Sequence, residues 1–384
     1  MAAFTTPGKI IIGEHALEEA GGLLAGFGRK ALIVTGKHVV TSPMMEELKG
    51  VLEEVKVAYA IFDGITGEPT NTMIEEGLAS YQREGCDFCI GIGGGSPLDS
   101  AKAIAAMVTN PGGIASYNGK TIAVPTPPVV AIPTTAGTGS EATKFTIITD
   151  LETDTKMLLK GDVLLPALAV VDPRFSMTSP KSVTAATGLD ALTHAVEAYT
   201  SVKAMPLTDS YAVSAIQRIL KWLPLAYRDG LDQEARKEMA IAALEAGICI
   251  NNSSVTIVHG MSRPIGALFH VPHGISNAML LTTCMRDVMD GALSRFADLG
   301  RAVGAACGAD SDSFAAKEFL KRLEEVCKAC QVPTLKEYGI EEEAFLQAIP
   351  KMAADAIQSG SPSNCRKEVT QEDCARLYKK AYAG

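Results

Sequence analysis

Short apolar runs alternate with amphipathic stretches over the first half of the chain. The amphipathic stretches carry apolar residues at spacings of three and four, the period of a helix that packs one face on a core, and cover residues 44–55, 70–84 and 97–108. The apolar runs are only as long as buried strands and cover residues 31–35, 57–62, 88–92, 129–132 and 167–171. This alternation predicts strand–helix–strand units and a mainly parallel sheet, as in a dinucleotide-binding domain.

The strand pattern ends near residue 182, and long amphipathic stretches follow it. They include residues 183–199, 208–222, 233–251, 292–304 and 314–330. Between the two halves, Asp172-Pro173 and Ser179-Pro180 interrupt regular structure, because proline disfavours helix at the residue before it. The sequence therefore predicts an α/β dinucleotide-binding domain at residues 1–178 and an all-α domain at residues 179–384.

Charge balance and the length of the apolar runs exclude several classes of partner. Lys plus Arg total 35 against 44 Asp plus Glu, a formal net charge of -9, and no basic cluster offsets it, so we expect no nucleic-acid partner. The apolar runs fall well short of the about 20 residues that a membrane span needs, and the first residues lack the pattern of a signal peptide. We expect a cytoplasmic protein with no membrane partner.

The nine cysteines predict reduced thiols and not a disulfide framework, because the chain is long and lacks secretory features. Two Cys-x-x-Cys pairs, Cys86 with Cys89 and Cys327 with Cys330, together offer four thiolates, enough for a zinc site. Each pair falls in a segment with the pattern of a separate core element. Core packing is therefore the preferred interpretation.

A glycine-rich turn follows the apolar run at residues 88–92. It consists of Gly93, Gly94, Gly95, Ser96 and Pro97 and leads into a helical pattern. Small residues let the backbone approach an anion, and the unpaired amides of a helix start favour a pyrophosphate. Such a turn can also be purely structural. The longer pattern is more specific, because Asp99 and Lys102 follow at helical spacing and a second loop, with Thr134, Thr135 and Thr138, follows another strand. Asp99 is therefore also a candidate cofactor contact.

Four side chains in the second half have the chemistry of a metal site. Asp190 and His194 are four residues apart, so a helix places both on one face. His259 and His273 follow, the latter next to Pro272 and Gly274 in a turn that can project its ring. Three nitrogens and one oxygen suit zinc or ferrous iron and leave a position open for a substrate oxygen. The alternative is a helix-surface pair with two histidines in core or loop positions.

These motifs resemble those of the iron-containing (group III) alcohol dehydrogenases. The similarity covers residues 93–102, 134–141, 185–199 and 259–274 and extends in order and spacing from about residue 7 to 380. It implies a cleft between the domains, a divalent ion, Fe²⁺ with Zn²⁺ as the alternative, NAD as the cofactor, and a dimer or larger homo-oligomer. It implies that Asp190, His194, His259 and His273 bind the ion, and that residues 93–97, Thr134, Thr135, Thr138 and Lys156 contact the cofactor.

The turn after the first strand departs from the family pattern. Many members have an acidic residue there that binds the adenosine ribose and excludes a 2′-phosphate, whereas this chain has Gly36. Without that carboxylate we expect NADP to be tolerated, with Lys37 or His38 available to pair with the phosphate. The alternative is that Gly36 only makes the turn and NAD remains preferred.

A second departure lies four residues after His259, where many members carry a histidine linked to proton transfer. This chain has Arg263, which is permanently charged and is not a base near neutral pH. Proton release must then use water, a ribose hydroxyl or a group such as His270. Arg263 also suggests a short aldehyde substrate with a sulfonate, carboxylate or phosphonate, unless it pairs with a helix carboxylate outside the pocket. By resemblance, Phe145 and Cys365 are further candidates for the substrate pocket.

Two other functions compete with the dehydrogenase. The dehydroquinate-synthase-like lyases resemble this architecture and use NAD with a metal, but they need additional basic residues around a phosphorylated substrate. A non-catalytic dinucleotide-binding or filament-forming protein could have kept the fold, although intact ligand positions argue against it. The predicted activity is hydride transfer between NAD(P)H and a short aldehyde or alcohol, with a neutral short-chain alcohol as the alternative substrate.

Overall fold

The computed structural model describes residues 3–153 and 155–383, and the chain divides into two compact units, Phe4–Thr178 and a second that begins at Ser179. The first unit contains a six-stranded parallel sheet in the order β1-β8-β5-β4-β2-β3. Its strands are β1 (Lys9–Ile12), β2 (Lys30–Val34), β3 (Ala58–Phe62), β4 (Phe88–Gly93), β5 (Val129–Pro133) and β8 (Leu168–Val171). The predicted parallel sheet is confirmed.

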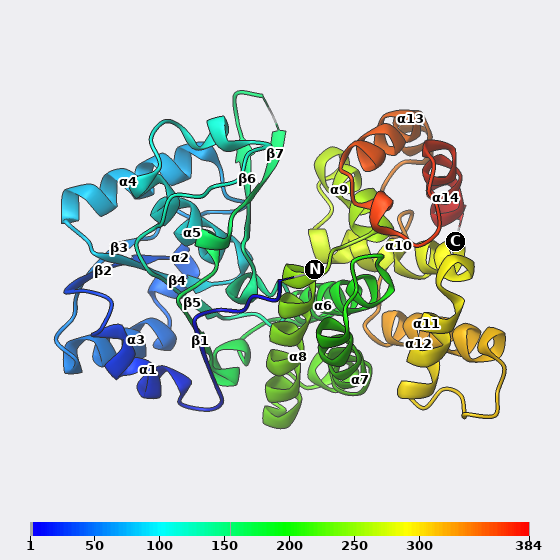
Figure 1. The fold of residues 1–384 in the computed structure, drawn as a ribbon, viewed down its shortest axis with the longest axis horizontal. Helices are drawn as coiled ribbons and strands as arrows, with labels where there is room; N and C mark the ends of the chain where they lie inside the picture. Colours follow the sequence, from blue (N-terminus) through cyan, green and yellow to red (C-terminus); the bar gives the residue numbers. More distant parts are fainter. Residues whose placement is uncertain (1–2, 154, 384) are drawn as a thin grey trace. The chain divides into compact units, whose positions relative to one another are not determined.

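Helices cover both faces of this sheet (Figure 1). Apolar side chains of α1 (Ala16–Leu24) and α3 (Pro43–Glu54) pack with Ile33, Ile90 and Ile132 on one face. On the other face, α4 (Asn71–Glu84) and α5 (Gly95–Thr109) pack with Leu32, Val34 and the hairpin of β6 (Phe145–Asp150) and β7 (Thr155–Lys160). Strands β4 and β5 are buried along their whole length, which explains why their sequences are continuous apolar runs.

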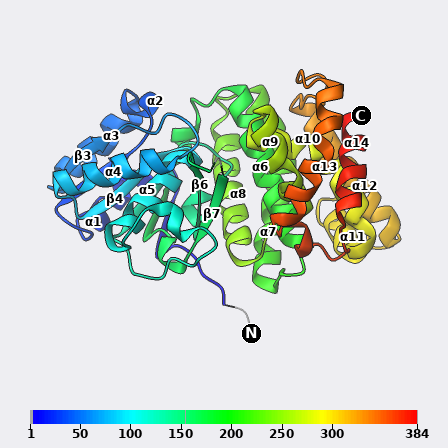
Figure 2. The same cartoon turned by 90° about the horizontal axis from the view of Figure 1, so that it is seen from above.

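The described residues of the second unit form helices and no strands, as predicted. Figure 2 shows α6 (Lys181–Thr200), α7 (Pro206–Arg228) and α8 (Gln233–Asn252) side by side, and these three helices contact one another. The remaining helices are α9 (Ile257–Phe269), α10 (His273–Val288), α11 (Leu293–Ala302), α12 (Asp312–Ala329), α13 (Glu342–Gln358) and α14 (Gln371–Ala383).

Several elements were not among the predicted ones. Strand β1 is only four residues long and half exposed, and α9 and α13 each contain a proline, so their local patterns are weak. These elements form because they pack on the rest of the unit. Among the described residues no single helix has the length and apolarity to cross a membrane, although α8 and α9, bent by 103° from each other, meet those two criteria when joined.

Candidate metal centre and cofactor-binding loops

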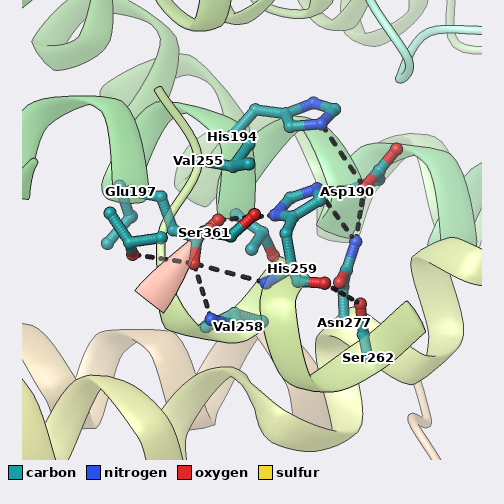
Figure 3. Close-up of polar contacts among 12 residues, drawn as sticks. Asp190, His194, Glu197, Val255, Val258, His259, Ser262, Asn277 and Ser361 are labelled. Atoms are coloured by element: carbon teal, nitrogen blue, oxygen red, sulfur yellow. Dashed lines mark hydrogen bonds and ion pairs between the residues drawn. The ribbon is translucent and has the colours of Figure 1, made fainter. Parts of the chain in front are cut away.

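Four side chains from three helices converge in the second unit. Asp190 and His194 come from α6, His259 from α9 and His273 from the first position of α10. The Oδ1 atom of Asp190 lies 3.8 Å from Nε2 of His194 and 3.5 Å from Nε2 of His259 (Figure 3). It lies 3.7 Å from Nε2 of His273. The chain therefore brings together the four side chains that its sequence singled out.

The distances from Asp190 Oδ1 to the three imidazole nitrogens fit a single small cation. Potential ligand atoms of Asp190, His259 and His273 also lie within 4.8 Å of one another, a group that does not include His194. Zinc-type bonds of about 2.0–2.2 Å place the donors of a four-coordinate ion about 3.3–3.6 Å apart, close to the observed spacing. Two buried carboxylates contact His259, Asp190 at Nε2 and Glu197 at Nδ1. With neutral imidazoles the two carboxylates carry two negative charges, which a divalent ion would neutralise. His273 is the most open of the four, with 40% of its side chain exposed.

Glu197 fixes the orientation of His259. Its Oε2 accepts a hydrogen bond of 2.5 Å from Nδ1 of His259, while its Oε1 accepts from Thr256 Oγ1 at 2.8 Å and Val258 N at 2.7 Å (Figure 3). In the neutral ring this bond keeps the proton on Nδ1, so that Nε2 presents a lone pair toward Asp190, as a metal ligand requires. Glu197 was not assigned a role from the sequence. Its spacing was a signal, because Glu197 follows His194 by three residues and Asp190 by seven, on one helix face.

The two carboxylates and three imidazoles perturb one another strongly. Burial raises the pKa of Asp190, but the nearby histidines lower it by more, so the carboxylate stays ionised. Burial lowers the pKa of His259, and Glu197 and Asp190 outweigh that effect and raise it to about 9. The raised pKa favours a second proton on His259, at Nε2, when no cation is bound, and a divalent ion would displace that proton on binding.

A close contact of backbone atoms brings the α10 ligand to α6. A Cβ atom on Gly274 would lie 2.0 Å from the carbonyl oxygen of Ala186, so only glycine fits there. Because Gly274 follows His273 directly, this approach of α10 to α6 places the His273 ring beside Asp190. The glycine that the sequence showed next to the ligand is thus required by packing between helices.

Arg263 lies one helical turn after His259 on α9 and is half-buried. The described residues place no carboxylate within 4 Å of its guanidinium, whose Nη1 donates only a long 3.4 Å hydrogen bond to Ser361 Oγ. Burial lowers the pKa of Arg263, and Glu197 is near enough to oppose this effect. The alternative of a helix-carboxylate partner is wrong for the described chain, because no such ion pair forms.

The other two candidates of this unit lie in different surroundings. His270 is exposed and ends α9 in a left-handed conformation, with φ of 54°, and none of the described hydrogen bonds joins it to the four metal-site residues. Cys365 is half-buried, and burial raises the pKa of its thiol to about 12, next to Thr256. Their predicted roles remain predictions.

In the first unit, the glycine turn has the geometry of an anion site. The strand β4 ends at Gly93, whose φ of 147° suits only glycine, and α5 begins at Gly95 without a side-chain cap at Gly94. The amides of the first turn of α5 are thus open to a ligand. The two predicted loops adjoin, since Thr134 N donates to Gly93 O at 2.8 Å and a Cβ atom on Gly95 would meet the Thr138 side chain at 2.9 Å.

A pocket of about 260 Å³ opens beside this turn. Its lining includes Gly36, Lys37, His38, Gly93, Gly94 and Pro97. A Cβ atom on Gly36 would lie 2.8 Å from the carbonyl oxygen of Ile65, so the chain approaches itself too closely there for a larger residue. The pocket joins the turn after β2 to the glycine turn after β4.

Asp99 and Lys102 hold the second loop in place. The Nζ atom of Lys102, fully buried, donates to Ser140 Oγ at 2.8 Å, Thr143 Oγ1 at 3.1 Å and the Phe145 carbonyl at 2.9 Å. Asp99 accepts hydrogen bonds from the Ser140 hydroxyl and from Ile147 N. The Asp99 carboxylate therefore supports the loop, and its contact with a cofactor remains a prediction.

Lys156 and Phe145 lie on the β6–β7 hairpin. Lys156 forms a 2.7 Å ion pair with Glu68, and Phe145 is half-buried at the start of β6. Their predicted contacts with cofactor and substrate stay predictions.

The Cys-x-x-Cys pairs belong to different units, one before and within β4 and the other at the end of α12. None of the described groups of potential metal ligands contains a cysteine. The second such group, Glu18, Glu47 and Asp172, surrounds the guanidinium of Arg174, which bonds all three carboxylates.

Comparison with known proteins agrees with this geometry. Residues 7–173 match the model of the family described as iron-containing alcohol dehydrogenase, and residues 184–382 match its C-terminal family. The chain is 35% identical over 384 residues to the NAD-dependent methanol dehydrogenase of Bacillus methanolicus, covering 99% of this chain and 100% of that one.

Two solved structures share the architecture. A 1,3-propanediol oxidoreductase superposes with a TM-score of 0.95 at 34% identity and covers 99% of this chain and 100% of its own. The sulfoacetaldehyde reductase of Bifidobacterium kashiwanohense, solved in complex with NAD⁺, superposes with a TM-score of 0.88 at 25% identity and covers 100% of this chain and 99% of its own.

Proposed function

Since the chain belongs to the iron-containing alcohol dehydrogenase family, and is thus an alcohol dehydrogenase or aldehyde reductase that uses NAD and a metal, we propose which residues and substrates its site employs. Asp190, His194, His259 and His273 bind one divalent ion, Fe²⁺ in preference to Zn²⁺. The observation that carries this proposal is the position of three imidazole Nε2 atoms 3.5 to 3.8 Å from Asp190 Oδ1. This donor set favours the dehydrogenase over the lyase and the non-catalytic alternatives.

The chain's own residues prepare the chemistry of this reaction. When bound, the ion acts as a Lewis acid that stabilises negative charge on the substrate oxygen during hydride transfer to or from the nicotinamide. Glu197 keeps His259 in the ligand tautomer, and buried Asp190 supplies the charge that retains the ion. Gly94, Gly95 and the open amides of α5 bind the cofactor diphosphate, with Thr134, Thr135, Thr138 and Lys156 as further cofactor contacts.

The test of the metal site is reconstitution. Protein stripped with a chelator should lose turnover and regain it with one equivalent of Fe²⁺, and more weakly with Zn²⁺. His273→Ala should lower metal stoichiometry below one per chain. Turnover that survives chelation, or a variant that binds metal like the wild type, would overturn the proposal.

We extend the cofactor proposal to NADP. The pocket lined by Gly36, Lys37 and His38 offers positive charge and no carboxylate among its lining residues, as a 2′-phosphate requires. Removing the cation with Lys37→Ala should raise KM for NADPH several-fold and leave KM for NADH nearly unchanged, with exposed Lys120→Ala as the control. Equal effects on both cofactors would contradict a phosphate contact. Gly36→Asp is a poor test, because its Cβ would collide with the Ile65 carbonyl.

For the substrate we propose a short aldehyde with an anionic end, bound by Arg263. The guanidinium lies one turn from a metal ligand, is permanently charged and has no carboxylate partner among the described residues. A half-buried cation without a direct ion-pair partner among the described residues favours an anionic ligand. The solved relative named sulfoacetaldehyde reductase supports a sulfonate, and a carboxylate or phosphonate offers equivalent geometry. A neutral short-chain alcohol is the second candidate, supported by the similarity to a methanol dehydrogenase.

Anionic and neutral short aldehydes separate these candidates. We expect Arg263→Ala to lower kcat/KM for an anionic aldehyde, sulfoacetaldehyde or succinic semialdehyde, by about 10- to 100-fold, the worth of one charge-assisted contact. Activity on propanal should change less than threefold, and metal content should remain one per chain. An equal loss on both substrates would leave the neutral alcohol as the better assignment.

The proton of the reaction must use a group other than Arg263. We propose that it passes through water or the cofactor ribose, with His270 as the protein candidate. His270→Asn should alter the acidic limb of the pH–kcat/KM profile if the imidazole takes part, and an unchanged profile would exclude it.

We further propose that the protein is cytoplasmic and forms a homodimer or larger homo-oligomer. Light scattering of the purified protein would test the oligomeric state.

A further inference from the structure

Asn277 lies at the centre of the metal-site residues although no motif singled it out. It is fully buried on α10, one turn after His273. Its Nδ2 atom lies 2.8 Å from Asp190 Oδ1 and 3.2 Å from Nε2 of His259 (Figure 3). The same atom lies 3.2 Å from Nε2 of His273. We propose that Asn277 is a fifth protein ligand, which presents its carbonyl oxygen to the divalent ion; this inference rests on the proposed metal site.

The hydrogen-bonding of this amide is unbalanced in the described structure. Three polar atoms, Asp190 Oδ1 and the Nε2 atoms of His259 and His273, lie within hydrogen-bond distance of Nδ2, which carries only two hydrogens. The Oδ1 atom is buried and has no hydrogen-bond partner among the described residues. Burying a carbonyl oxygen without a hydrogen-bond partner costs folding free energy. In Asn277 this unpartnered atom is the oxygen, which is the atom of the side chain that can bind a metal ion.

A cation bound by Asp190 and the three histidines would favour the oxygen end of the Asn277 amide facing these ligands. An N–H group that points at a divalent ion is repelled, whereas a carboxamide oxygen is a good ligand for divalent metals. The two ends of the amide have nearly the same size, so turning the group by 180° exchanges them within the same packing. Turning the amide breaks the 2.8 Å hydrogen bond from Nδ2 to Asp190 Oδ1, and binding of the ion by both oxygens would replace it, whereas Oδ1 has no hydrogen bond to lose among the described residues.

The distances favour coordination by this atom position. For bonds of about 2.0–2.2 Å, adjacent donors of a five- or six-coordinate ion lie about 2.8–3.1 Å apart, closer than the about 3.3–3.6 Å of a four-coordinate ion. The amide atom lies 2.8 to 3.2 Å from three of the proposed ligands. A neutral oxygen added to three imidazoles and one carboxylate also favours Fe²⁺ over Zn²⁺, which is usually four-coordinate.

Cobalt(II) tests the proposal without depending on activity, because its visible absorption weakens as coordination number rises above four. Stripped full-length protein is titrated with Co²⁺ in competition with a chelator. Asn277→Leu, which keeps the shape but has no donor, should bind Co²⁺ about 10- to 100-fold more weakly and absorb more intensely. Asn277→Asp restores an oxygen and should restore both properties. Thr282→Ala, half-buried on the same helix, is the matched control and should match the wild type.

The outcomes separate this inference from the proposed site. If wild-type protein binds no Co²⁺, or His273→Ala binds it equally well, the site itself is wrong and Asn277 with it. If the wild type binds Co²⁺ but Asn277→Leu has unchanged affinity or an unchanged spectrum, the site stands and Asn277 is not a ligand. If Asn277→Asp does not restore the Co²⁺ spectrum, the inference is also overturned. If Asn277→Leu does not fold, the Co²⁺ affinity and spectrum of Asn277→Asp are the test.

Discussion

Replacing Glu197 by glutamine should weaken metal binding through a change of histidine tautomer. The Oε1 atom of Glu197 accepts from Thr256 Oγ1 and Val258 N. A glutamine oxygen must take that place, because an NH₂ group there would face two donors. The NH₂ group then faces His259 Nδ1, which has to accept, and the ring proton moves to Nε2, the atom that points at Asp190. The substitution thus removes the lone pair of His259 Nε2 that would bind the metal, although His259 itself is unchanged.

The magnitude follows from the role of the carboxylate. Loss of a partner that orients a ligand typically costs 10- to 100-fold in metal affinity, or about 1.4 to 2.7 kcal/mol. Loss of one of the two buried negative charges acts in the same direction. Competition titration of stripped protein with Co²⁺ measures the change, and circular dichroism confirms the fold.

Glu245→Gln is the matched control for this substitution. Glu245 is a half-buried glutamate on α8 that accepts from Ser214 Oγ at 2.9 Å and belongs to no described group of metal ligands. We expect its metal affinity to equal that of the wild type. An affinity of Glu197→Gln within twofold of the wild type would refute the tautomer argument.

Three further predictions concern the supports of the two sites. Lys102→Met leaves three buried acceptors without their donor, so urea unfolding should show a loss of about 3–5 kcal/mol, and a loss below about 1 kcal/mol would contradict the anchoring role. Gly274→Ala places a Cβ atom 2.0 Å from a carbonyl oxygen, and Gly300→Ala places one 2.1 Å from another, so both variants should have a lower melting temperature. Only Gly274→Ala should bind Co²⁺ more weakly. Equal Co²⁺ affinity of the two variants would refute the link between Gly274 and His273. Burial raises the pKa of Glu141 from its usual 4.5 to about 7, so the protonated form stabilises the native state and wild-type stability falls as pH rises from about 4.5 to 7. Glu141→Gln removes this dependence and should gain up to about 3 kcal/mol relative to the wild type between those pH values, whereas parallel stability curves would contradict it.

The sequence by itself determined the architecture and the chemical identity of the site. Local periodicity distinguishes buried strands from amphipathic helices, so the five apolar runs and the helices between them predicted the parallel sheet. Spacing within one helix is equally local, which is why Asp190 and His194 could be assigned to one face. The glycine turn after β4 was visible because its backbone needs glycine.

Only the tertiary structure decided which distant atoms meet. His259 lies more than 60 residues beyond Asp190, and no local pattern states that its Nε2 faces the carboxylate or that Glu197 holds its other nitrogen. The same holds for the partnerless oxygen of Asn277, for the loop contacts of Lys102 and for the absence of a carboxylate beside Arg263 among the described residues. Contacts between helices depend on how their faces pack, and packing is a property of the folded chain as a whole.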